Sequence, residues 1–165
     1  MIAAPTTKSW SKNGQDLNGA GAFASPTLLD VELHSKVGAN APYVVNSPAT
    51  WCHEGLHGVD NDIQISLSCF GDQFFCAFYV GNGQFVEVPL PQIVTRADCV
   101  EHIPRAARIG RFDFYFNVVN SHEAHRTTQY IAEEWNAYIF GCQAGLEVVK
   151  ANKWTDTARE NLFQG

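Results

Sequence analysis

The longest regular pattern of apolar positions lies in the last third of the chain and predicts an amphipathic helix. Asn120 or Ser121 would cap this helix, which would run to about Ala151. Its apolar residues recur at intervals of three and four, as one packed helix face requires: Ile131, Trp135, Tyr138, Ile139 and Cys142. Gly141 and Gly145 predict a kink in its second half.

Shorter apolar runs predict a small sheet. Two such runs flank Gly81-Asn-Gly83 and predict a β-hairpin over residues 73–89, because this turn needs positive φ angles. Residues 111–117 alternate strictly between aromatic and polar side chains, which predicts a half-buried strand. Residues 28–37 alternate more loosely and predict a first strand. Strands and helices mix without regular alternation, so the expected fold class is α+β.

Three further segments complete the expected organisation. A helix should begin at Pro48, with the preceding serine as its cap, and should run to about His57 or Val59. Residues 97–103 predict a short helix. Residues 1–25 are rich in small and polar residues and predict a loop-like N-terminal arm.

Composition limits the classes of function. A length of 165 residues with 45% hydrophobic residues predicts one domain with a substantial core, which we place at residues 26–157. No apolar run reaches the roughly 18 residues of a membrane helix. The net charge is −6, and the 11 Lys and Arg residues are scattered. These features argue against a nucleic-acid or membrane partner.

The two ends carry hints about processing and compartment. Residues 160–165 resemble a protease recognition site used to remove purification tags, so we treat them as a tag remnant. The start lacks a signal peptide, but the small residues and proline after Met1 are common just after signal cleavage. This start, together with the few lysines and the many Asn, Ser and Gly residues, predicts a secreted or periplasmic protein. The five cysteines leave disulfide pairing open.

The candidate chemistry begins at residues 53–57, which read His-Glu-Gly-Leu-His and match H-E-x-x-H. On a helix, His53 and His57 share one face and can both bind zinc. Glu54 beside them could take a proton from a zinc-bound water. Gly55 weakens a helix by roughly 1 kcal/mol relative to Ala, which a metal bridging two turns can offset. The alternative is a chance match between ordinary histidines.

A catalytic zinc site also needs a third protein ligand. The second histidine is not followed by G-x-x-H, since Asp60 and Ile63 occupy those positions. Cys52 adjoins the motif but would point to another helix face. A glutamate on the long C-terminal helix is the remaining option.

The chain resembles the H-E-x-x-H zinc metallopeptidases whose third ligand is a glutamate, the gluzincins. Their glutamate typically stands in E-x-x-[AS]-[DE], and residues 134–137 match the first four positions. Tyr138 departs from the pattern, because a carboxylate normally supports a ligand there. Residues 50–62 are most similar to the segment in lethal-factor-like toxins, where two acidic residues also follow the second histidine. The resemblance covers these residues and residues 130–138.

The resemblance implies a small zincin-like domain, with its sheet packed against an active-site helix and the C-terminal helix. His53, His57 and Glu134 would hold one Zn²⁺ per chain, with Glu133 as the alternative third ligand. Glu54 would act as general base. Tyr130, one turn before Glu134, would stabilise the oxyanion. The implied activity is hydrolysis of a peptide or protein substrate by a zinc metalloendopeptidase.

Neighbouring residues suggest supporting roles. Asp60 or Asp62 would hydrogen-bond the far nitrogen of a ligand histidine, or would form a hydrated turn at a helix end. Tyr138 could replace Tyr130 or cover a ligand. The substrate would add as a strand beside the hairpin or beside residues 111–117.

Two other classes of function fit the same sequence. One is a catalytically inactive zincin-like domain that binds zinc or a partner, which the departure at Tyr138 favours. The other is a metal-free, aromatic-rich binding module in which the motif is accidental. Zinc content separates this third class from the others, and the effect of Glu54→Gln separates the first two. The sequence leaves substrate, cleavage preference and oligomeric state open.

Overall fold

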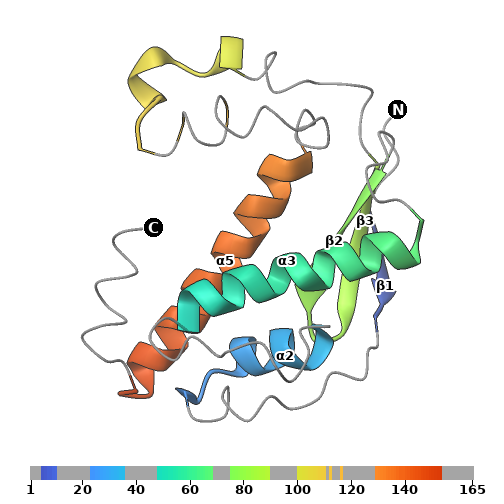
Figure 1. Ribbon diagram of the computed structural model, residues 1–165, viewed down its shortest axis with the longest axis vertical. Helices are drawn as coiled ribbons and strands as arrows, with labels where there is room; N and C mark the ends of the chain where they lie inside the picture. The colour runs from blue at the N-terminus through green and yellow to red at the C-terminus, as the bar shows by residue number, and fades with distance from the viewer. Residues whose placement is uncertain are drawn as a thin grey trace.

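The computed structural model of the chain describes residues 5–10, 23–35, 48–68, 75–89, 100–110, 112, 116 and 129–153. Its principal elements follow in chain order: β1 (Thr6–Ser9), α2 (Pro26–His34), α3 (Pro48–Ser66), β2 (Phe75–Gly81), β3 (Gln84–Pro89), the 3₁₀ turn η1 (Arg105–Ala107) and α5 (Gln129–Lys150). Helix α3 crosses α5, with α2 against both and the sheet behind α3 (Figure 1). This combination of helices with a small antiparallel sheet confirms the α+β prediction.

The sheet has the strand order β1-β3-β2, and both pairs of strands are antiparallel. The predicted hairpin is confirmed over β2 and β3. Its turn residues Gly81, Asn82 and Gly83 have φ angles of 94°, 54° and 67°, which Gly and Asn adopt most readily. Strand β1 lies within the segment expected to be a loop-like arm, so that expectation is wrong at these four residues.

A strand was expected at residues 28–37, but residues 28–34 belong to helix α2, and residues 36 and 37 lie outside the described segments. Ser25 caps the helix by accepting a hydrogen bond from Leu28 N at 3.1 Å, and Pro26 follows in the first turn. Leu28 and Val31 are fully buried, at the spacing of one helix face. The Ser-Pro start is the sequence signal that the loose alternation obscured.

Helix α3 begins at Pro48 as predicted but continues to Ser66, about two turns beyond the expected end. The glycine inside the motif has a packing role. A Cβ atom at Gly55 would lie 3.0 Å from Val31 Cγ1 and 3.2 Å from a ring carbon of Trp51. Glycine therefore lets α2 approach the motif-bearing turn closely.

Helix α5 ends at Lys150, close to the predicted end, and is unbroken through both glycines, so the expected kink is wrong. The predicted packed face is also wrong. Trp135 is 70% exposed and Ile139 is 52% exposed, and Cys142 is exposed as well. The residues of α5 that are buried are small or medium-sized: Ala137, Gly141, Ala144, Gly145 and Val148.

The reason is a close crossing between α3 and α5. A Cβ atom on Gly141 would lie 2.8 Å from the carbonyl oxygen of Ala49, so the two backbones nearly touch there. Only glycine fits at the point of closest approach, and alanine occupies the neighbouring buried positions 137 and 144. Several larger apolar side chains of the helix are therefore exposed instead, among them Trp135, Ile139 and Leu146.

Two other predictions fall partly outside the described segments. Phe112 and Phe116 have helical conformation, and their rings stack with centroids 4.8 Å apart, so the strand expected at residues 111–117 is wrong at both. The other residues of that range lie outside the description. Residues 100–102 are helical, in agreement with the short helix expected at 97–103.

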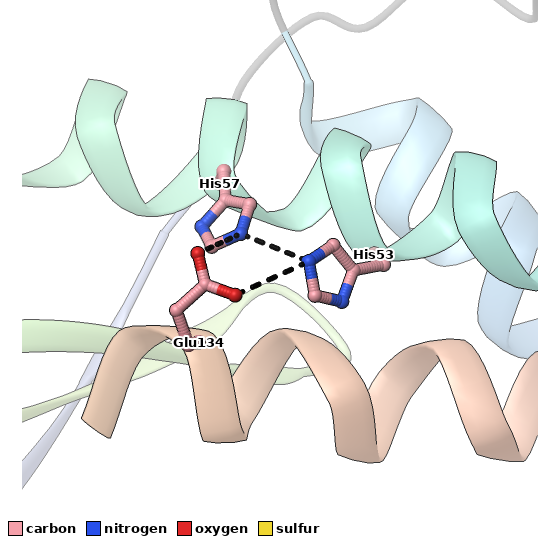
Figure 2. A group of neighbouring side chains, drawn as sticks. All are labelled: His53, His57 and Glu134. Atoms are coloured by element: carbon pink, nitrogen blue, oxygen red, sulfur yellow. Dashed lines mark hydrogen bonds and ion pairs between the residues drawn. The ribbon is translucent and has the colours of Figure 1, made fainter. Parts of the chain in front are cut away.

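The core lies between α2, α3, α5 and the sheet, and α3 contributes most of its large side chains. Those buried on α3 are Trp51, Cys52, Leu56, Val59 and Ile63. They leave the histidine face of α3 turned toward α5 (Figure 2). Among the parts of the chain that the structure describes, no helix is long and apolar enough to cross a bilayer.

Candidate metal centre

Three side chains from α3 and α5 meet where the two helices face each other. His53 and His57 project from successive turns of α3, and Glu134 projects toward them from α5 (Figure 2). The two Nε2 atoms are 3.2 Å apart. Glu134 Oε2 lies 3.6 Å from Nε2 of His53, and its Oε1 lies 3.4 Å from Nε2 of His57. All potential ligand atoms lie within 4.8 Å of one another.

The separation of the two nitrogens fits a tetrahedral ion, and either Glu134 oxygen could be the third ligand atom. Two atoms bound at about 2.0–2.1 Å, with a tetrahedral angle between them, are about 3.3–3.4 Å apart. The two Nε2 atoms, 3.2 Å apart, lie close to that value, and each has a different Glu134 oxygen near it, at 3.6 Å for His53 and 3.4 Å for His57. Two imidazole nitrogens and one carboxylate are also a donor set that zinc prefers. The residues thus fit a zinc ion with one further coordination position.

The electrostatics of the cluster favour a cation. Side-chain exposure is 12% for His53, 22% for His57 and 12% for Glu134. Burial lowers the pKa of His57, but the Glu133 and Glu134 carboxylates outweigh burial and raise the pKa to about 10. A proton on His57 supplies the positive charge that the two carboxylates stabilise. A metal ion would have to displace that proton to bind.

The two neighbouring glutamates occupy different places. Glu134 faces both Nε2 atoms, whereas Glu133 Oε1 lies 3.7 Å from Nδ1 of His57. Carboxylates in the latter position orient a ligand histidine and set its tautomer. The geometry therefore favours Glu134 over Glu133 as the candidate third ligand.

Asp60 and Asp62 lie inside α3 rather than at its end. Both are buried within α3, so a hydrated turn at a helix end is wrong for either residue. Asp60 Oδ1 accepts a hydrogen bond from Tyr79 N at 2.6 Å, and burial raises the pKa of Asp60 well above its ordinary value. The expected bond from Asp60 to a ligand histidine is therefore wrong, and Glu133 stands nearest to that role.

Glu54 lies at the exposed side of the cluster. Its side chain is 70% exposed, and Oε1 is 4.0 Å from Nε2 of His53. A carboxylate at this place is next to the candidate ligands and open to solvent. It can therefore exchange protons with a water molecule beside the cluster.

The two candidate tyrosines differ in what the structure describes. The ring of Tyr138 packs edge-on against His53, with centroids 4.5 Å apart and an interplanar angle of 68°. It thus covers a candidate ligand, which was one of the two roles expected. Tyr130 lies on α5 one turn before Glu134, but its side chain falls outside the described part of the chain.

Asn136 is a polar residue near the cluster that sequence reasoning missed. It donates from Nδ2 to Tyr79 O at 3.0 Å. Gln64 donates from Nε2 to Ala77 O at 3.3 Å. Together with Asp60, these side chains occupy the outer edge of β2 at residues 77–79. A substrate strand therefore has no free main-chain partner at Tyr79, and strand addition to the hairpin is wrong at that residue.

Comparison with protein-family models, with curated proteins and with solved structures finds no match for this chain. The interpretation of the cluster accordingly rests on its residues and their geometry.

Proposed function

We propose that the chain is a zinc-dependent metallopeptidase with a zincin-like arrangement of helices, in which His53, His57 and Glu134 hold one Zn²⁺. One observation carries the proposal. A glutamate from α5 faces both Nε2 atoms of the H-E-x-x-H helix, at separations of 3.4 and 3.6 Å. Two imidazole nitrogens 3.2 Å apart with a carboxylate beside both are a donor set suited to a tetrahedral zinc site.

The mechanism assigns each nearby residue one task. Bound zinc would polarise the scissile carbonyl and lower the pKa of its water toward about 7. Glu54 takes the proton of the attacking water and passes it to the amine that leaves. Glu133 holds the imidazole of His57 in the tautomer whose Nε2 is available for binding.

Stabilisation of the oxyanion is assigned to Tyr130, because its position on α5 is one turn before Glu134. The substrate is a peptide or protein, consistent with a secreted or periplasmic hydrolase. Its main chain would have to bind elsewhere than at Tyr79 on the β2 edge, since Asp60 and Asn136 occupy the polar groups there.

A second function is a catalytically inactive domain that binds zinc or a partner. Tyr138 favours it, because this residue packs on His53 where the gluzincin pattern has a carboxylate. The two functions share the metal site and differ only in whether Glu54 does chemistry.

The test is Glu54→Gln, assayed against a peptide library beside the parent. Loss of the general base should lower kcat/KM by about 100-fold or more, while zinc content stays at the parent value because Glu54 is not a ligand. Full activity in Glu54→Gln would overturn the assignment of the base. A zinc-loaded parent that cleaves no peptide would favour the inactive binding domain.

A further inference from the structure

The main chain of Tyr79 is held by two side chains from different helices. Asp60 Oδ1 accepts the Tyr79 N–H at 2.6 Å, and Asn136 Nδ2 donates to the Tyr79 carbonyl at 3.0 Å. Asn136 Nδ2 also lies 3.5 Å from Asp60 Oδ2. Asp60 and Tyr79 are both fully buried. These three residues are called the Tyr79 clamp below.

The clamp connects the two helices that carry the candidate ligands. Asp60 follows His57 on α3 by three residues, and Asn136 follows Glu134 on α5 by two. Asp60 and Asn136 are thus each within one turn of a candidate ligand on their own helix. A shift of either helix relative to Tyr79 would change the ligand spacing.

The side chain of Tyr79 is also held in place by hydrogen bonds. Its hydroxyl group donates to Asp30 at 3.0 Å and accepts a hydrogen bond from Gly83 N at 2.8 Å. It also lies 2.9 Å from Nδ1 of His34. Residues of α2 and of the hairpin turn therefore hold the side chain, while the clamp holds the main chain.

Where the described parts of α3 and α5 pack most closely, near Gly141 and Ala49, the contact is made by small residues. Ala137, Gly141 and Ala144 are buried on α5, and small apolar surfaces define a separation better than a register. Zinc sites tolerate deviations of only about 0.2 Å in ligand distance. Hydrogen bonds with defined geometry are suited to setting that register.

We propose that Asp60 and Asn136 are positioning residues that set α3 against α5 by gripping the main chain of Tyr79, and so preorganise the zinc ligands. The inference rests on the proposed metal site. These residues would act through the main chain of a strand, and neither of them would bond to a ligand side chain.

The test compares Asn136→Ala with Gln64→Ala in the full chain. Gln64 on α3 bonds to the same strand edge, at Ala77, but this bond does not involve α5. Its loss should therefore not change how α3 lies against α5. Both variants should lower the urea midpoint of the metal-free protein to a similar extent. Only Asn136→Ala should weaken zinc binding, by about 10- to 100-fold in a chelator competition, with Gln64→Ala within about twofold of the parent.

A second readout reports ligand geometry directly. Cobalt(II) in place of zinc gives a visible spectrum that is sensitive to tetrahedral coordination, and this spectrum should change in Asn136→Ala but not in Gln64→Ala. Asp60→Asn serves if Asn136→Ala does not fold, because it keeps the shape but can turn an amide NH₂ donor toward Asn136 Nδ2, where Asp60 has Oδ2. Its cobalt spectrum should also change.

The outcomes separate the two proposals. A parent that binds zinc, with Asn136→Ala matching its affinity and cobalt spectrum, would overturn the positioning inference alone. Equal loss of affinity in Gln64→Ala would also overturn it, since that result indicates general destabilisation. A parent that binds neither zinc nor cobalt would overturn the metal site, and the inference with it.

Discussion

At the scale of single residues, one helical step separates two different tasks. Glu133 and Glu134 are adjacent, yet one faces Nδ1 of His57 and the other faces both Nε2 atoms. The H-E-x-x-H spacing predicted His53 and His57, and the resemblance to the gluzincins implied Glu134. The sequence left Glu133 open as a ligand, because a helix pattern defines a face only to within about one residue, or 100° of rotation. Side-chain direction on a folded helix distinguishes them.

Substitution of each glutamate by glutamine should separate the tasks. Glu134→Gln should abolish stoichiometric zinc binding, because it removes a charged ligand. Glu133→Gln should retain zinc with affinity lower by about 10- to 100-fold, as is typical when the partner of a ligand histidine is lost. Chelator competition measures both. The reverse order of effects would exchange the two roles.

At the scale of elements, the contact between α3 and α5 places the site. Periodicity correctly predicted a long helix ending near Lys150, but it chose the wrong face as the packed one. An apolar stripe identifies the helix face that is most hydrophobic when the helix is considered by itself. It does not show that a crossing helix approaches so closely that only Gly141 and Ala-sized residues fit. The sequence pattern of α5 does not contain the position of the α3 backbone at Ala49, which decides which face of α5 is packed.

Gly141→Ala tests this crossing. The added methyl group would lie 2.8 Å from the Ala49 carbonyl oxygen, and backbone cannot move aside as a flexible side chain can. We expect the free energy of unfolding to fall by about 1–3 kcal/mol in urea titrations, despite the better helix propensity of Ala. Cys142→Ala, at the neighbouring exposed position, should stay within about 0.5 kcal/mol. Equal stability of Gly141→Ala and the parent would contradict the close crossing.

A second contact between elements joins α5 to the start of α2. Glu147 accepts hydrogen bonds from Ser25 Oγ at 2.8 Å, Thr27 N at 3.0 Å and Thr27 Oγ1 at 2.8 Å. Burial raises the pKa of Glu147, but these bonds outweigh burial and lower the pKa below its ordinary value of 4.5. The carboxylate thus acts as a cap for α2 supplied from another helix.

Glu147→Gln should lower stability by about 1–3 kcal/mol at pH 7, the range for hydrogen bonds to a charged group. Because the folded-state pKa is depressed, the contribution is fully present above the unfolded pKa. It is lost as pH falls below 4.5 and through the folded pKa. Denaturant titrations from pH 7 downward should show the parent approaching the variant. The exposed control Glu101→Gln should show no such convergence, and a constant difference would argue against the charged cap.

At the scale of the whole molecule, local signals predicted the fold class and the hairpin, together with the start of α3. They failed at α2, where the cap signal at Ser25 and Pro26 competed with a weak alternation. The site itself combines two segments far apart in the sequence. The H-E-x-x-H motif pointed to the first and the gluzincin resemblance to the second, but only the packing of α3 on α5 brings His57 and Glu134 within 3.4 Å. No sequence motif predicted the Tyr79 clamp, because Asp60 and Asn136 bond to main-chain atoms, which every residue type has.

The most direct test of the metal centre is metal content by mass spectrometry on the purified parent, beside His57→Ala and Glu134→Ala. We predict about one zinc per chain in the parent and its loss from both variants, since a three-ligand site does not survive removal of one ligand at ordinary zinc concentrations. A parent without zinc, even after reconstitution, would contradict the account, as would full zinc content in Glu134→Ala.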